Sequence, residues 1–301
     1  MSPPRTSPLL RAVLLLLALA ELTFTAWQWC HPPIGVLLFH ELAEPRSARD
    51  FWTVPPSAFR AILDRLATLG LRCLDDAELA ACRGNWRGWP RSCVLTFDDG
   101  LRSHLQLAAP ELARRGLPGV FFVVAERFGP PRMSPVDVRQ LAGLGFSIGS
   151  HSVTHASLVQ APAEPTWQYL RRLAGEIAGS RGRLTALVGR PIRSFAYPGG
   201  EVSAEARALV GAAGYDFGFT TELGHVTAWS EPAALPRNLL FRDATPDSVE
   251  DWLMAPSRWL ALRLMLDNLM LLLLVASFAM RRRQAASRPS GSKLASASST
   301  R

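Results

Sequence analysis

The segment that decides the fold is Cys93-Val94-Leu95-Thr96-Phe97-Asp98-Asp99-Gly100. Its first five residues are uncharged and largely apolar, which predicts a buried strand that ends directly in two aspartates. Two adjacent carboxylates after a buried strand are electrostatically expensive unless a cation or a proton lies between them. The alternative is a turn in which one aspartate caps the next helix. Taken alone, Asp-Asp-Gly favours that alternative.

Apolar segments of this kind alternate with helical patterns along the chain. The alternation predicts a parallel sheet covered by helices, and the most common closed form of such a sheet is a β/α barrel. We therefore expect an α/β fold, a distorted (β/α) barrel of parallel strands, over residues 31–255. The expected strands are 35–39, 93–97, 119–124, 146–148, 194–196 and 217–220, and the expected helices are 56–69, 106–115, 134–144, 166–188 and 204–213.

A second cluster, Ser150-His151-Ser152-Val153-Thr154-His155, follows the expected strand 146–148. Two histidines at i,i+4 on one helical turn point the same way and can share a divalent metal. Nitrogen ligands favour zinc and its neighbours over calcium or magnesium. A pair of exposed loop histidines is the alternative.

A third cluster runs from Arg193 to Gly200 and contains a Pro-Gly-Gly turn. The turn would expose backbone N–H groups that can face a developing oxyanion. The arginine before it can hold a carboxylate in place. An ordinary turn at the end of a strand explains the same segment.

In order and approximate spacing, the three clusters together resemble the polysaccharide deacetylases with a NodB-type homology domain, the fourth family of carbohydrate esterases. The resemblance begins at Val36-Leu37-Leu38-Phe39-His40-Glu41, which is similar to a histidine-bearing first strand, and ends near Leu235-Pro236-Arg237. It covers about residues 35–245. The layout looks most like the subgroup that de-N-acetylates poly-N-acetylglucosamine exopolysaccharide at the cell envelope.

The resemblance implies a role for each matching residue. Asp98 matches the general base that takes a proton from a metal-bound water, and Arg193 looks like the residue that orients this base. The backbone N–H of Tyr197 would help to stabilise the oxyanion. Three residues match the ligands of a divalent metal, with zinc the expected ion: Asp99, His151 and His155.

One departure from the family concerns the general acid. The family commonly closes with a Leu-x-His motif whose histidine protonates the leaving amine, but residues 235–245 contain no histidine. His225 is the nearest substitute in sequence, and we take it as the candidate acid. His104 and His40 are further candidates, although His40 fits better as a structural or substrate-contacting residue at the mouth of the barrel.

Both ends of the chain are apolar and flanked by basic residues. Residues 1–30 are expected to be a signal peptide or an uncleaved N-terminal membrane anchor. Residues 256–283 are expected to form a C-terminal transmembrane helix, because an apolar run ends at Arg281-Arg282-Arg283. An amphipathic helix on the membrane surface is the alternative. Residues 284–301 are expected to be a disordered basic tail, cytoplasmic, with the barrel on the outer side.

The formal net charge of +8 belongs to the chain ends. Residues 1–11 carry two arginines and residues 281–301 carry six basic residues, neither segment has an acid, and the region between them is neutral. A nucleic-acid-binding domain needs its positive charge on a folded face, so the sequence predicts no nucleic-acid partner.

The function expected from these observations is metal-dependent removal of acetyl groups from an N-acetylated aminosugar polysaccharide at the cell envelope. The expected partners are the acetylated polysaccharide, the membrane and the machinery of exopolysaccharide or envelope biosynthesis. One alternative is an O-acetyl esterase acting on an acetylated glycan. Another is a degenerate member that binds glycan without turnover.

Overall fold

The computed structural model describes residues 31–47, 50–85 and 88–256, together with residues 16, 19–21, 23, 24, 26, 27, 30 and 266. The expected N-terminal anchor or signal peptide, the expected transmembrane helix and the basic tail lie, but for a few positions, outside the described residues. Within the part of the chain that is described, no helix is both long enough and apolar enough to span a bilayer.

The strands form a curled, mostly parallel sheet in the order β10-β1-β5-β6-β7-β8-β9. From β1 to β9 each strand is parallel to its neighbour, as the alternating pattern predicts. The expected distorted (β/α) barrel is therefore confirmed. The central strands are β1 (Ile34–Phe39), β5 (Ser92–Phe97), β6 (Val120–Val123), β7 (Ser147–Ser150), β8 (Ser194–Ala196) and β9 (Phe217–Phe219). The shorter ones are β2 (Glu41–Leu42), β3 (Thr53–Val54), β4 (Arg72–Leu74), β10 (His225–Val226) and β11 (Asn238–Leu239).

The extended segment 235–239 bridges the two ends of this curled sheet. Leu235 pairs in parallel with Phe219 of β9, and β11 pairs in parallel with Leu37 and Leu38 of β1. The sheet has no spare room at this closure, since a Cβ on Gly218 would lie 2.4 Å from the carbonyl oxygen of Ala233. Arg237 lies in the middle of this segment, and its side chain is fully buried inside the barrel.

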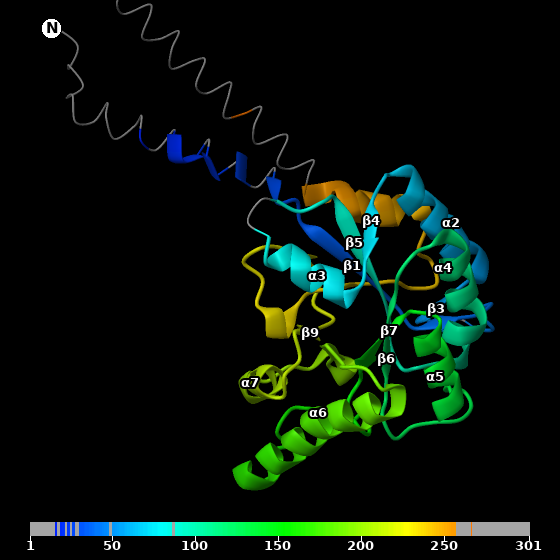
Figure 1. Cartoon of the computed structure of the whole chain (residues 1–301), viewed down its shortest axis with the longest axis vertical. Coiled ribbons are helices and arrows are strands. Elements are labelled where there is room, and N and C mark those ends of the chain that lie inside the picture. Colours follow the sequence, from blue (N-terminus) through cyan, green and yellow to red (C-terminus); the bar gives the residue numbers. More distant parts are fainter. Residues whose placement is uncertain are drawn as a thin grey trace, which may run out of the picture. The chain divides into compact units, whose positions relative to one another are not determined.

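Helices cover the outside of the sheet. In Figure 1, α2, α4 and α5 follow one another along one side of the strands, and α6 and α7 continue round the next side. The Ser134–Asp137 capping box that begins α5 forms as its sequence suggests. The helices are α2 (Pro56–Thr68), α3 (Asp76–Arg83), α4 (Ala109–Arg115), α5 (Pro135–Gly143), α6 (Thr166–Val188) and α7 (Ala204–Ala212), with one π-helical turn at His104–Ala108 and 3₁₀ turns at Pro198–Gly200 and Pro232–Ala234.

Aromatic packing fixes the strand that leads into the aspartate pair. The ring of Phe97 stacks between Phe39 and Phe121, at centroid distances of 5.3 and 4.5 Å, and Phe59 of α2 packs on the same side. Phe97 therefore faces the helices. Because side chains alternate along a strand, Thr96 and Asp98 point the other way, into the barrel.

Candidate active site

Asp98 and Arg237 form a bidentate ion pair inside the barrel. The two guanidinium Nη atoms donate to the two carboxylate oxygens at 2.8 Å each, and the side chains are 2% and 0% exposed. The Nε atom of Arg237 donates to the carbonyl oxygen of Thr220 at 2.8 Å. Its guanidinium also lies over the rings of Phe122 and Phe219. The segment 235–239 thus places the guanidinium of Arg237, fixed by these contacts, at the end of β5.

The ion pair decides the charge of Asp98. Burial by itself would raise the pKa of this carboxyl. The positive charge of Arg237, the nearby His151 and the hydrogen bonds from Arg237 outweigh burial, so the pKa is lowered well below its ordinary value. Asp98 is therefore a carboxylate at neutral pH, and each of its oxygens keeps a second lone pair as an acceptor.

Asp99, His151 and His155 converge on one point beside this pair. Their potential ligand atoms all lie within 4.8 Å of one another. Nε2 of His155 is 3.5 Å and Nε2 of His151 is 4.0 Å from Oδ1 of Asp99. Asp99 adopts a left-handed conformation, with φ of 74°, which turns it away from the direction of its neighbour Asp98.

The hydrogen bonding of His151 fits a metal ligand. Its Nδ1 lies 2.9 Å from the carbonyl oxygen of Ala196, which can only accept, so Nδ1 carries the proton. Nε2 is then left with a free lone pair facing Asp99. Burial lowers the pKa of His151, although Asp98 and Asp99 oppose that shift, and the neutral form favoured by burial is the one that binds metals. One carboxylate and two imidazoles suit zinc or a similar ion.

The two histidines do not lie on a helical turn, so that part of the prediction is wrong. Residues 151–155 form an irregular loop in which Ser152 and His155 have φ near 60°. The loop keeps this shape because Oγ of Ser152 accepts from the backbone N–H of His155 at 2.9 Å. The histidines meet through loop geometry rather than through helical spacing.

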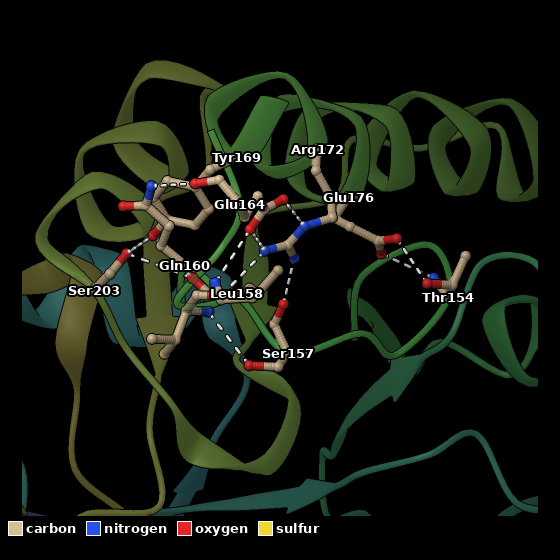
Figure 2. Close-up of polar contacts among 11 residues, drawn as sticks. Thr154, Ser157, Leu158, Gln160, Glu164, Tyr169, Arg172, Glu176 and Ser203 are labelled. Carbon is tan, nitrogen blue, oxygen red and sulfur yellow. Dashed lines mark hydrogen bonds and ion pairs between the residues drawn. The ribbon is translucent and has the colours of Figure 1, made fainter. Parts of the chain in front are cut away.

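Glu176 of α6 holds the middle of this loop, a contact that the sequence did not reveal. Its buried carboxylate accepts from the backbone N–H groups of Val153 and Thr154, each at 2.9 Å, and from the hydroxyl of Thr154 at 2.7 Å. Figure 2 shows Glu176 reaching from the helix to Thr154. The residues between His151 and His155 are thus tied to a rigid element.

The stretch after His155 is tied to the same helix. Arg172 pairs with Glu164 and donates to the carbonyl oxygens of Ser157 and Val159 (Figure 2). The hydroxyl of Tyr169 donates to the carbonyl oxygen of Leu158 at 3.1 Å. The long loop therefore has few free backbone groups and a defined path over the barrel mouth.

Arg193 is not the partner of Asp98, and that prediction is wrong. Its guanidinium pairs with Asp216 at 2.7 Å, and both side chains are well exposed. Arg193 immediately precedes β8, so it lies at the end of the strands opposite to Asp98, which follows β5. Arg237 takes the expected role. In the sequence, the feature that could have indicated Arg237 is its place in the segment that follows the last barrel strand.

Tyr197 cannot serve as the predicted oxyanion donor in this arrangement. Its backbone N–H already donates to the carbonyl oxygen of Phe219 at 3.0 Å, as part of the pairing between β8 and β9. Its buried phenol donates to the carbonyl oxygen of Ala233 at 2.6 Å. Tyr197 fastens the barrel closure instead.

His225 lies at the wrong end of the barrel for a general acid, so this prediction is also wrong. It pairs with Gly35 near the beginning of β1, its ring stacks on Trp252 at 4.0 Å, and its Nε2 lies 3.1 Å from the carbonyl oxygen of that residue. Burial lowers its pKa to about 4. These contacts give His225 a structural role.

His40 is the histidine that the structure places beside the carboxylates. It directly follows β1, whose last residue Phe39 is in register with Phe97, and the charges of Asp98, Asp99 and His151 all act on its pKa. Burial lowers the pKa of His40, and the two carboxylates oppose that shift. Its Nδ1 has no hydrogen-bond partner among the described residues.

His104 contacts the backbone of His40. It is fully buried, and its Nε2 lies 2.7 Å from the carbonyl oxygen of His40. Burial lowers the pKa of His104 to about 4, so the ring is neutral. Because it is packed against Phe97 and Phe121, His104 stabilises the end of β1 rather than meeting substrate.

Comparisons with known proteins agree with this architecture. A model of the family described as polysaccharide deacetylase matches residues 88–218. The chain is 26% identical over 204 residues to "Putative polysaccharide deacetylase YxkH" of Bacillus subtilis (strain 168), covering 66% of this chain and 69% of that protein.

Two solved structures share the fold over 73% of this chain. One is the deacetylase PplD of Streptococcus pyogenes in complex with acetate, with a TM-score of 0.67 and 20% identity over 98% of that chain. The other is IcaB from Ammonifex degensii, with a TM-score of 0.63 and 25% identity over 97% of that chain. The chain thus carries a polysaccharide deacetylase domain, which the family model matches over residues 88–218.

We expect Arg237→Met to cost about 3–5 kcal/mol of stability at neutral pH, because it leaves Asp98 buried and unpaired. In the wild type the lowered pKa of Asp98 contributes stability above pH ~4 that is lost as the pH falls. In the variant, burial raises this pKa, so the destabilisation should shrink towards acid pH. Urea unfolding of metal-free protein at pH 4 and pH 7.5 measures the difference.

The matched control is the double variant Asp98→Asn with Arg237→Met, which removes both charges. It should recover most of the stability lost in the single variant. An equal loss at both pH values would mean that packing of Arg237, not its charge, supports the site.

Proposed function

We propose that this protein hydrolyses the N-acetyl groups of an aminosugar polysaccharide at the cell envelope, using a divalent metal, with zinc the expected ion. The observation that carries the proposal is the convergence of three ligand atoms within 4.8 Å beside a buried carboxylate held ionised by Arg237. Asp99, His151 and His155 would hold the metal. It would polarise the acetyl carbonyl and acidify the attacking water.

Asp98 would accept the proton of the attacking water. Its lowered pKa keeps it ionised at neutral pH but also makes it a weak base. Such a base works only on a water whose own pKa is depressed, so the base and the metal site require one another. Arg237 fixes the direction of both carboxylate oxygens and limits the loss of orientation during proton transfer.

His40 would protonate the departing nitrogen, in place of the family's closing histidine. It shares the barrel mouth with Asp98, and the charges of Asp98 and Asp99 oppose the lowering of its pKa by burial, which favours the protonated form that an acid needs. The position of His40 favours amide hydrolysis over the alternative of O-acetyl ester hydrolysis, because an amine leaves only after protonation. The intact set of ligands and its buried base argue against a degenerate, non-catalytic member.

The envelope location and the membrane partner rest on the sequence of the chain ends, which lie almost entirely outside the described residues. The apolar segments flanked by arginines support a barrel on the outer side and a basic tail inside. A tethered enzyme of this kind would act on a polymer as it is made or exported, beside exopolysaccharide or envelope machinery.

We expect the purified full chain to contain one divalent ion per molecule. His155→Ala should lower this content at least about tenfold, because it removes one of three ligands, whereas the matched His225→Gln should leave it unchanged. Elemental analysis after dialysis measures the stoichiometry. A metal-free wild type that cannot be loaded with zinc, cobalt or nickel would remove the metal from the proposal.

Asp98→Asn should reduce acetate release by about 10²–10⁴-fold while the metal stays bound, because the amide cannot accept a proton. Acetate release from poly-N-acetylglucosamine, peptidoglycan, chitin oligomers and acetylxylan should be assayed with wild type and variant together. Release from the aminosugar polymers is expected. Release from acetylxylan alone would favour the O-acetyl esterase.

His40→Gln should lower kcat on an N-acetyl substrate by about 10²-fold and affect an O-acetyl ester much less, since an alkoxide leaves more easily than an unprotonated amine. His225→Gln is the matched control and should retain wild-type kcat on both substrates. Equal losses on amide and ester in His40→Gln would contradict the role of acid.

A further inference from the structure

Trp52 and Phe241 form an exposed aromatic shelf next to His40. Their side chains are 49% and 41% exposed, and their ring centroids are 5.5 Å apart at an angle of 36°. The ring of Trp52 in turn lies 5.2 Å from the imidazole of His40. Three rings therefore run in an unbroken row from solvent to a residue of the candidate active site.

The topology places this row at the mouth of the barrel. Trp52 immediately precedes β3, which pairs with β2, the short strand that follows His40. Phe241 comes two residues after β11, which is parallel to β1 and in register with it. Both aromatic residues therefore lie at the same end of the strands as His40 and Asp98.

The shelf rests on a defined backbone. The N–H of Glu41 donates to the carbonyl oxygen of Trp52 at 3.3 Å, and the N–H of Arg242 donates to that of Phe51 at 3.0 Å. The guanidinium of Arg242 covers the ring of Phe51 at 5.4 Å. These contacts fix the two aromatic segments against each other, so the rings are presented in advance of any ligand.

We propose that the shelf binds a pyranose ring of the substrate, in the sugar unit next to the one that loses its acetyl group. The inference rests on the proposed function and adds a sugar-binding subsite to it. A pyranose ring presents axial C–H groups on its faces, which pack on the electron-rich face of an aromatic ring and remove apolar area from water. The hydroxyl groups at its rim stay solvated.

The surroundings fit a neutral sugar better than an anionic membrane. Residues 41–52 and 241–243 contain four acids and three arginines, so they provide no excess of positive charge for lipid headgroups. The shelf is also continuous with the candidate catalytic groups through His40. A substrate needs this continuity, whereas a membrane or protein partner does not.

The test uses the full chain and pentamers of N-acetylglucosamine in β-1,4 and β-1,6 linkage. Trp52→Ala should raise KM for the pentamer that the wild type deacetylates by about tenfold, with kcat within twofold and little change on 4-nitrophenyl acetate. Trp52→Phe should restore most of the affinity. Trp52→Leu should not, because it keeps an apolar surface but has no ring face.

The matched control is Trp229→Ala, which removes a tryptophan that is 77% exposed and lies near β10, at the opposite end of the barrel. It should leave KM unchanged. An unchanged KM in Trp52→Ala, or a wild-type KM in Trp52→Leu, would overturn the stacking of a sugar on the aromatic shelf. A wild type inactive on every acetylated sugar would instead remove the proposed function.

Titration of the Asp98→Asn protein with the same pentamers gives equilibrium affinities with little turnover. The pentamer should bind about tenfold more weakly when Trp52→Ala is added, and thermal unfolding should show that both proteins are equally folded. Equal pentamer affinities of Asp98→Asn with and without Trp52→Ala would contradict the subsite even if the kinetic effect were found.

Discussion

The buried ion pair between Asp98 and Arg237 is the interaction on which the site depends. Both charges lie out of water, so each strongly stabilises the other. Arg237 can reach Asp98 only because the segment 235–239 joins β9 to β1. Closure of the barrel therefore brings the guanidinium of Arg237 to Asp98 and keeps that carboxyl ionised.

The loop of residues 151–155, which carries two of the candidate metal ligands, adopts conformations that other parts of the fold must hold. Asp99, Ser152 and His155 all have positive φ, a region that costs a residue with a side chain on the order of 1 kcal/mol or more. Hydrogen bonds from Val153 and Thr154 to Glu176 offset the part of this cost that falls on Ser152 and His155. The strain brings the carboxylate and two imidazoles to one point before any ion arrives.

Sequence reasoning found the residues that follow strands but not the residues that hold them. Asp98, Asp99, His151 and His155 could be predicted because parallel strands bring their C-terminal ends together, whatever the local geometry of each turn. The partner of Asp98 could not, because Arg193 and Arg237 are both arginines near late strands. Which one enters the barrel depends on how the sheet closes. Glu176 could not be predicted either, because nothing in the sequence indicates that this one glutamate of a long helix is buried.

The errors over Arg193 and His225 have a common physical cause. Each lies near the end of a strand where the chain enters the barrel, and each is engaged there, Arg193 with Asp216 and His225 with Trp252. Each strand takes the chain from one end of the barrel to the other. A residue can therefore be close in sequence to the candidate site and still lie at the opposite end of the barrel. His40 satisfies the geometric requirement instead, because it leaves β1 at the end where Asp98 leaves β5. A proton donor for the leaving group has to be sought among the residues that leave strands there, and His40 is one of them.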